Sequence, residues 1–464
     1  MYMGKIIGSY MVPHPPIIIP EVGKGGEAEA AETIKAVKRA AADIGKARPA
    51  TIIVTTPHGP VFEDYIYISS SETLEGTMSR FGAKDVKLRF ENNLDLVDRI
   101  IEAAREKDIP CGGIDDTISG KYRISKELDH GAAVPLYFIN REYSDFKLVH
   151  ISIAAMPFEQ LYVFGICIQK AIEDSDEEVM FVASGDLSHR LSEDAPYGYS
   201  AKGREFDALL LDSVEKMDIS TLIRMDEGFC DQAGECGLRS FLMMFGALDG
   251  YELRPEVYSY EGPFGVGYSV VRFFIGDRKA ERSLLTRAKE ENGKTENPYV
   301  NLARNTLETY VREGRIVEVP KDLPKEMLEN RAGTFVSLKK FGQLRGCIGT
   351  IGPTRVSIAE EIMQNAISAG TEDPRFSPVR PEELEHLVYS VDVLHAPEPI
   401  ESLEQLDVIR YGVIVRSGRR SGLLLPNLEG VTTPEEQVSI ALQKAGIRSG
   451  EKYEMERFEV VRHK

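Results

Sequence analysis

The sequence predicts an α/β domain followed by an α+β domain. In the first part of the chain, β-branched runs alternate with helical segments, as in a sheet whose parallel strands are joined by helices. Residues 277–294 are dense in Arg, Lys and Glu with little apolar content, which is typical of a linker. Beyond them, strands and helices interleave irregularly. We therefore expect a mostly parallel central sheet flanked by helices in residues 1–276, a linker at 277–294, and an α+β domain at 295–464.

The first domain opens with a βαβ unit. Lys5 to Val12 is an apolar run that predicts a buried strand. The helix expected at 25–46 has apolar residues at helical spacing, and a second strand follows at 51–56. A crossover of this kind is expected to be right-handed. The remaining elements are predicted, in order, as a strand at 65–70, a helix at 93–107, a strand at 146–154, a helix at 158–172, a strand at 179–183, helices at 199–217 and 238–248, and two edge strands within 251–275.

The second domain begins with a predicted helix at 299–313. Two short β-rich segments separated by a polar turn indicate a hairpin, and alternating apolar residues predict a further strand and a second hairpin. The expected elements are a hairpin of 334–338 and 344–349, a helix at 357–369, a strand at 387–394, a hairpin within 412–425 and a helix at 434–445.

Composition excludes several classes of protein. The net charge of −18 argues against a broad nucleic-acid or anionic-membrane surface, because such surfaces need clustered Lys and Arg. No apolar run is long enough to span a bilayer, and the N-terminus lacks the pattern of a secretory signal, so we expect a cytoplasmic protein. The five cysteines are scattered without CxxC spacing, which indicates neither a disulfide framework nor a thiolate zinc site. The oligomeric state stays open.

Three predicted strands end in titratable side chains. His14 follows the first strand in a Pro-His-Pro turn, and His58 follows the second in a Pro-His-Gly turn. Prolines make these turns stiff, and ligands bind at the carboxyl edge of a parallel sheet. A third strand runs into Ser-Gly-Asp-Leu-Ser-His at 184–189. A single such histidine would more simply be a surface residue at a strand end, but the repeated setting favours one shared site.

The residue types in this set suit a metal ion. Two imidazoles and one carboxylate with open positions beside them form the arrangement used by non-haem Fe(II) oxygenases, and His14, His58 and Glu235 can supply it. Glu235 lies near the start of a helix, where it could instead be a helix-start acid. Its neighbour Cys236 is an alternative third ligand, better suited to Zn(II) or Cu(I). Adjacent helical residues point about 100° apart, so only one of the two should face the metal.

Two further histidines are candidates for catalysis. His189 is expected to act as an unligated acid or base, with Asp186 three residues earlier to orient it. His130 could bond a substrate oxygen, and its alternative role is that of a helix cap. His150 lies inside an alternating strand and is expected to be a satisfied core residue. We treat His386, His395 and His463, which have no companion groups, as surface or incidental residues.

These motifs carry a family resemblance that covers nearly the whole chain. Residues 1 to about 275 resemble the LigB-type class III extradiol dioxygenases through His-Pro-Pro at 14–16, Pro-His-Gly at 57–59, Gly-Asp-Leu-Ser-His at 185–189 and the Glu before the last long helix. They are also similar to the Memo-like branch, which has a Cys-Gly pair, here 236–237. Leu-Arg-Gly-Cys-Ile-Gly at 344–349 resembles the signature of the family named after the AMME contiguous deletion syndrome. The fused arrangement resembles the protein A family of the AmmeMemoRadiSam system.

The resemblance implies roles for individual residues. The dioxygenase family implies Fe(II) on His14, His58 and Glu235, with His189 as the base that deprotonates a catechol-like diol and His130 near the substrate. The Memo-like branch implies the same two histidines with Cys236, which would admit Zn or Cu, and implies Asp186 and His189 close by. We favour Glu235 as the third ligand.

Two functions follow as expectations. The first is an Fe(II)-dependent oxidoreductase that acts on a catechol-like small molecule. The alternative is a metal-binding accessory protein that works with a radical SAM partner in protein or cofactor modification, without ring cleavage. In the second domain, Cys347 beside Arg345 could be a reactive thiol, although a small buried residue in a tight turn is the simpler interpretation.

Overall fold

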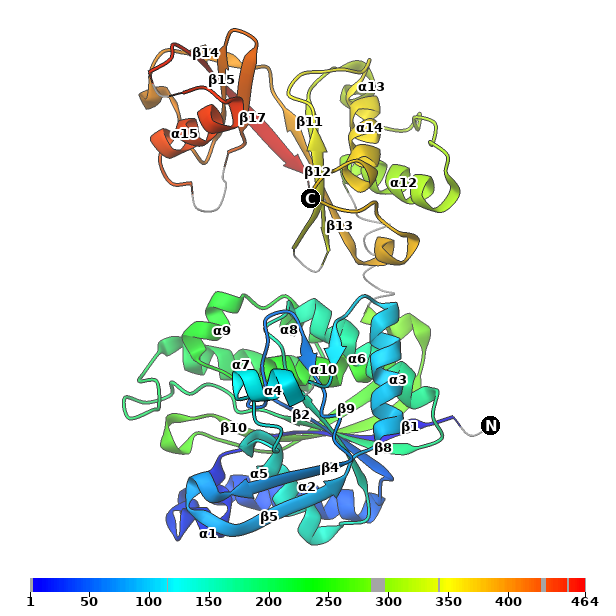
Figure 1. Ribbon diagram of the computed structural model, residues 1–464, viewed down its shortest axis with the longest axis vertical. Helices are drawn as coiled ribbons and strands as arrows, with labels where there is room; N and C mark the ends of the chain where they lie inside the picture. Colours follow the sequence, from blue (N-terminus) through cyan, green and yellow to red (C-terminus); the bar gives the residue numbers. More distant parts are fainter. Residues whose placement is uncertain are drawn as a thin grey trace. The chain divides into compact units, whose positions relative to one another are not determined.

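The chain divides into two structural units, Met1–Arg287 and Ala288–Lys464 (Figure 1). The computed structural model describes residues 3–114, 116–284, 297–340, 343–426, 431–448 and 450–463. Part of the expected linker, 285–294, therefore lies outside the described residues.

A six-stranded mixed sheet forms the centre of the first unit. Four parallel strands lie side by side, and two antiparallel strands complete one edge. This confirms the predicted central sheet. The strand order is β7 (Lys147–Ser152), β2 (Thr51–Thr56), β8 (Glu178–Ser184), β1 (Lys5–Val12), β10 (Tyr268–Arg278) and β9 (Tyr251–Glu261).

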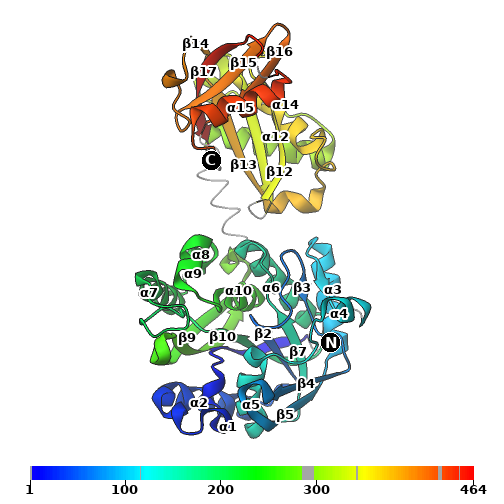
Figure 2. The same cartoon turned by 60° about the vertical axis from the view of Figure 1, so that its left-hand side comes forward.

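Helices cover both faces of this sheet. α2 (Ala31–Ala47) and α5 (His130–Glu142) lie on one face, and α3 (Leu94–Glu106), α6 (Phe158–Glu173) and α10 (Leu238–Ala247) lie on the other (Figures 1 and 2). All six residues of β2 are buried. This double coverage explains why the strand appears in the sequence as an unbroken β-branched run rather than an alternating one. The other helices of the unit are α1 (Pro20–Gly23), α4 (Asp116–Tyr122), α7 (Ala201–Lys216), α8 (Ile219–Ile223) and α9 (Glu227–Ala233).

Several segments of the first unit differ from the prediction. The expected helix at 25–46 begins only at Ala31, because Gly25 has a φ of 107° and a 3₁₀ turn at Gly26–Ala30 follows it. The expected strand at 65–70 is reduced to β3 (Ile66–Tyr67), which pairs with β6 (Cys111–Gly112). An antiparallel hairpin of β4 (Thr73–Met78) and β5 (Ala83–Glu91) was not predicted. The carboxyl ends of the central strands are where the prediction and the structure agree most closely.

The second unit is an α+β domain, as predicted. Its seven strands form a curled antiparallel sheet, and helices α12, α14 and α15 pack on it (Figure 2). The strand order is β12 (Gln343–Gly349), β11 (Thr334–Lys340), β13 (Leu387–Leu394), β17 (Glu454–His463), β15 (Tyr411–Ser417) and β16 (Arg420–Leu424), with β14 (Glu398–Ile400) paired to β17. The helices are α12 (Pro298–Glu313), α13 (Lys325–Glu329), α14 (Ile358–Thr371) and α15 (Pro434–Ala445).

Two details of this unit correct the sequence-based picture. β17 was not predicted, although it lies between β13 and β15, because its sequence mixes charged and apolar residues. His386 was expected to be a surface or incidental residue, and its burial contradicts the surface alternative. In the described part of the chain, no helix combines the length and apolar character that crossing a bilayer requires.

Candidate metal centre

The residues that follow three neighbouring strands lie at the same level of the sheet edge. β2, β8 and β1 are adjacent and parallel, so their carboxyl ends coincide, and Val12 of β1 is in register with Ser184 of β8. His14, His58 and Asp186 each lie two residues beyond the end of their strand. Equal spacing on parallel neighbours brings three side chains from distant parts of the chain into one place.

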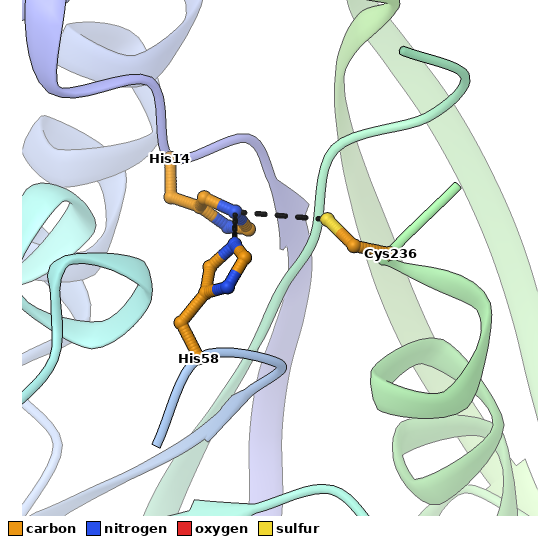
Figure 3. A group of neighbouring side chains, drawn as sticks. All are labelled: His14, His58 and Cys236. Atoms are coloured by element: carbon orange, nitrogen blue, oxygen red, sulfur yellow. Dashed lines mark hydrogen bonds between the residues drawn. The ribbon is translucent and has the colours of Figure 1, made fainter. Parts of the chain in front are cut away.

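His14 and His58 face each other at this edge. Their Nε2 atoms lie 2.9 Å apart, and the two rings are nearly perpendicular, at 87° (Figure 3). Two nitrogens each about 2.1 Å from one ion, at a right angle, would be roughly 3.0 Å apart. The pair therefore has the separation that two ligands of a single metal ion need.

The hydrogen bonds of His14 fix its tautomer. Its Nδ1 lies 2.9 Å from the hydroxyl of Ser184, and that hydroxyl donates its hydrogen to the carbonyl of Gly131 at 2.5 Å. A hydroxyl has one hydrogen to give, so Ser184 must accept from Nδ1–H of His14. The Nε2 atom of the neutral ring then presents a lone pair to the site, as a metal ligand must. Sequence reasoning did not single out Ser184.

Both histidines are held in the neutral form. Burial, and then the nearby His130, lower the pKa of His14 to about 3. His58 is exposed where it faces a pocket, but its Nε2 points inward, and desolvation followed by the effect of His14 lowers its pKa to about 3 as well. Neutral imidazoles bind metal ions without first losing a proton.

Cys236 is the third member of the group. Its Sγ lies 3.7 Å from Nε2 of His14, and the ligand atoms of His14, His58 and Cys236 all lie within 4.8 Å of one another (Figure 3). Burial raises the pKa of the thiol well above its ordinary value, followed by the charges of Asp186 and Glu235. A bound cation would favour the thiolate.

Glu235, our expected third ligand, has a different local role. Its carboxylate accepts a hydrogen bond of 2.7 Å from the main-chain N–H of Leu238, at the start of α10. Desolvation raises the pKa of Glu235 to about 7. Of the two neighbours considered from the sequence, Cys236 and not Glu235 is grouped with the two histidines among the described residues.

Two glycines explain why Cys236 can lie so close to His14. A Cβ on Gly185 would lie 2.2 Å from the Cα of Gly237, so the end of β8 and the start of α10 touch through their backbones. The amide N–H of Asp186 points at the Sγ of Cys236 at 3.4 Å. Glycine at both positions permits this approach, which sets the thiol opposite His14.

Asp186 and His189 lie beside Cys236, and Oδ2 of Asp186 is 3.7 Å from Nε2 of His14. The three form a second group whose ligand atoms lie within 4.8 Å of one another. Nδ1 of His189 donates to the carbonyl of Gly234 at 2.8 Å, which leaves Nε2 of the neutral ring free as an acceptor, 3.8 Å from Asp186 Oδ2. Burial raises the pKa of Asp186 to about 6. Asp186 also accepts from the main-chain N–H of His14 at 2.9 Å.

His130 completes the histidine cluster from another direction. It is the first residue of α5, and its ring stacks on that of His58 with centroids 4.2 Å apart and 20° between the planes. The helix cap is the preceding residue, Asp129, which accepts from the N–H groups of Gly131 and Ala132. Desolvation lowers the pKa of His130.

Asp129 links the cluster to the core. Its carboxylate accepts from the hydroxyl of Thr56 at 2.6 Å and from Nε2 of His150 at 3.0 Å, and Nδ1 of His150 meets the hydroxyl of Ser69 at 2.8 Å. Burial pushes the pKa of Asp129 upward, but these hydrogen bonds and the charge of His150 lower it overall. His150 is a satisfied core residue, as expected, and it also supports the carboxylate that begins α5.

A pocket of roughly 600 Å³ opens beside the cluster. His58 and His130 line this pocket, and the rest of its wall comes from the segment after His58, the β4–β5 turn and the segment before α5. The volume is in the range of small-molecule sites. The donor set, its neutral histidines and this pocket together fit a centre that holds a first-row metal ion next to a bound small molecule.

Comparison with known proteins agrees with this architecture. Residues 8–271 match the model of the catalytic LigB subunit of aromatic ring-opening dioxygenase, and residues 300–463 match the AMMECR1 model. A protein of Clostridium acetobutylicum is 46% identical over 463 residues, covering 98% of this chain and 99% of its own length. A Thermotoga maritima protein is 51% identical over 171 residues, covering 36% of this chain and 98% of its own.

Solved structures are more distant. The crystal structure of an uncharacterized protein from Pyrococcus horikoshii has a TM-score of 0.33 and 35% identity, and it covers 35% of this chain and 88% of that one. The family matches place a LigB domain ahead of an AMMECR1 domain in a single chain. This chain therefore belongs to the family of the catalytic LigB subunit of aromatic ring-opening dioxygenases, with an AMMECR1 domain fused after it.

Proposed function

We propose that the N-terminal unit is a metal-dependent oxidoreductase that acts on a catechol-like small molecule. The observation that carries the proposal is the 2.9 Å separation of the His14 and His58 Nε2 atoms at the edge of a LigB-family sheet. A pocket of small-molecule size adjoins these two groups. A dry, shaped cavity beside an open metal position is what substrate activation by a metal requires.

The ion is held by His14, His58 and Cys236 in this proposal. Two imidazoles and a thiolate favour Cu or Zn over Fe(II), whereas family membership favours Fe(II). Loading the protein with each metal in turn identifies which ion supports the activity. When bound, the ion supplies Lewis acidity toward a substrate hydroxyl and, if it is redox-active, a path for electrons.

The remaining groups act on the substrate. His189 accepts a hydroxyl proton at its free Nε2, since its Nδ1–H is occupied by the carbonyl of Gly234. His130 faces the pocket beside His58 and hydrogen-bonds a substrate oxygen. Asp186 supports His14 by accepting a hydrogen bond from the main-chain N–H of His14, and it lies beside His189.

Oxygen uptake tests the activity. The full chain is loaded anaerobically with Fe(II), Cu or Zn in separate samples, mixed with a panel of catechols, and exposed to a known amount of O₂. We expect uptake with at least one metal and one catechol. His189→Ala should lower the rate by about 100-fold or more without releasing the metal, whereas the exposed His395→Ala should behave like the parent. Full metal retention without uptake on the whole panel would contradict the proposal.

A pair of neighbouring substitutions tests the third ligand. Cys236→Ala should weaken metal binding by about 100-fold or more, because a thiolate donor is lost. Glu235→Gln should leave the affinity within about threefold, since the amide oxygen can still accept from Leu238. Competition with a chromophoric chelator measures both. Loss of metal in Glu235→Gln with retention in Cys236→Ala would return the assignment to Glu235.

A further inference from the structure

We propose that Arg80 and Arg123 bind an anionic group of the substrate in the pocket beside His58 and His130, which makes them specificity-determining residues. The identification of the occupant as the substrate rests on the proposed function. The preference of the pocket for an anion does not, because it depends only on groups in the pocket wall.

The pocket wall combines apolar side chains with two histidines. Phe62, Phe81 and Ile124 line it, together with His58 and His130. The ring of Phe81 meets the ring of His130 edge to face, with centroids 5.3 Å apart, and His130 stacks on His58. Such walls suit a flat ring, with its reacting end toward the histidines.

The two arginines reach the pocket from separate segments. Arg80 lies in the 3₁₀ turn Ser79–Phe81 between β4 and β5, and Arg123 follows the end of α4. Within the described ranges, neither guanidinium has an ion pair or hydrogen bond to another side chain. By contrast, Arg89 on the same hairpin is paired with Glu75 at 2.9 Å. The donors of Arg80 and Arg123 are therefore available to a ligand.

The acidic residues of the wall do not balance these charges. Asp129 is already occupied by Thr56, His150 and the start of α5. Glu127 is the other acid among the described lining residues, and it opposes two arginines. The positive charge also acts on His130, because Arg80 is one of the groups that lower the pKa of His130, after desolvation as the main cause.

The chemistry of guanidinium groups indicates the ligand class. Arginine forms paired, charge-assisted hydrogen bonds with carboxylate and phosphate groups, which have matching planar or tetrahedral oxygens. We therefore expect a substrate with an aromatic or similarly flat body, hydroxyl groups directed at the histidines and a carboxylate or phosphate at the other end.

Ligand binding to the full chain tests this, both as purified and after chelator treatment, so that no metal contributes. The probes are phenol, 4-hydroxybenzoate and phenyl phosphate, which share a ring and differ in charge. Titration calorimetry or ligand NMR gives the dissociation constants. We expect at least one anion to bind about tenfold more tightly than phenol, with a smaller preference at high salt. The stronger anion separates a carboxylate substrate from a phosphate one.

Substitutions assign the preference to the two residues. Arg80→Gln and Arg123→Gln should each reduce the anion preference by about threefold to tenfold, and the double variant should abolish it. Arg80→Lys should retain part of it. Arg89→Gln, on the same hairpin but outside the pocket, should change nothing. Both target side chains are exposed, so these variants should fold normally.

The outcomes separate this inference from the proposed function. Equal binding of phenol and both anions, or an unchanged preference in the double variant, overturns the role of the arginines. An anion preference that depends on the arginines, without O₂ uptake on any catechol, leaves the anion pocket in place and removes the oxidoreductase proposal. If O₂ uptake depends neither on the charge of the catechol nor on the two arginines, the oxidoreductase proposal stands and the anion pocket is removed.

Discussion

The Nδ1 atom of His14 lies 2.9 Å from the hydroxyl of Ser184, at the last residue of the neighbouring strand β8. Because Ser184 donates onward to the carbonyl of Gly131, the contact fixes which nitrogen of His14 carries the hydrogen. The tautomer that presents a lone pair at Nε2 is thus set by the pairing of two strands.

Ser184→Ala should weaken metal binding by about 10- to 100-fold, because the support that fixes the His14 ring and tautomer is lost. Chelator competition measures the affinity. Ser240→Ala is a matched control, since it removes another buried hydroxyl, one that pairs with Thr55 and lies outside the metal centre. It should cost similar stability, about 1 kcal/mol, without affecting the metal. Equal metal affinity in both variants would show that the Ser184 contact does not set the ligand.

Gly185→Ala should separate Cys236 from His14. The new Cβ would lie 2.2 Å from the Cα of Gly237, so the end of β8 and the start of α10 must move apart. We expect a loss of about 3 kcal/mol in stability and a weaker metal site. Calorimetry and chelator competition report the two effects. Gly120→Ala, where nothing lies within 4 Å of the added methyl, should be close to neutral. Unchanged stability in Gly185→Ala would mean that the contact is not tight.

The His150–Asp129 pair should stabilise the fold because His150 gives a buried carboxylate a hydrogen-bond partner. The two atoms are 3.0 Å apart, and the side chains are 1% and 9% exposed. His150→Leu leaves Asp129 without that partner and should cost about 3 kcal/mol. His150→Leu combined with Asp129→Asn removes the orphan charge, so it should be more stable than the single variant. Chemical denaturation of the three proteins checks this order, and the reverse order would contradict the role given to the pair.

The sequence predicted the strand ends of this centre, and it left two candidates for the third donor, with Glu235 favoured and Cys236 as the alternative. His14 and His58 could be placed because prolines mark where β1 and β2 stop. The choice between Glu235 and Cys236 depended on a helical turn that does not extend that far. Gly234 has a φ of 64° and α10 begins only at Leu238, so the 100° rule did not apply to the pair. Which residue faces the histidines was set by the close contact of Gly185 with Gly237, which joins distant segments.

The pocket was also beyond the sequence reasoning, because the hairpin that supplies Arg80 was missed. A signal was present in β5, where Val86, Leu88 and Phe90 alternate with polar residues and are buried. Its partner β4 contains Gly76 and Thr77, which weaken the strand pattern. Helix α5 was obscured by Pro135 and by apolar residues on all sides. The only sign of its start was the possible helix cap considered at His130.

Asp207 should make the first unit lose stability as the pH rises from acid toward neutral. It is buried, accepts from the N–H of Ser188 at 2.8 Å and from the hydroxyl of Tyr260 at 2.7 Å, and has its pKa raised by burial from 3.8 to about 6. The folded state therefore holds this proton more tightly than the unfolded state. The contribution of Asp207 to the free energy of unfolding is greatest below the pKa that the group has in the unfolded state. It falls by about 3 kcal/mol as the pH rises, and most of this fall occurs between about pH 4 and pH 6.

Asp207→Asn isolates this contribution from the other titrating groups. The amide keeps an acceptor for Ser188 and a partner for Tyr260 but does not titrate. Calorimetry of the first unit's transition in the full chain at several pH values gives the difference in stability between parent and variant. That difference should shift in favour of Asp207→Asn as the pH rises toward 7, because only the parent must then bury a charge. A difference that is constant from acid to neutral pH would mean that the carboxyl keeps an ordinary pKa, and that water or a relaxed backbone solvates it beside Ser188.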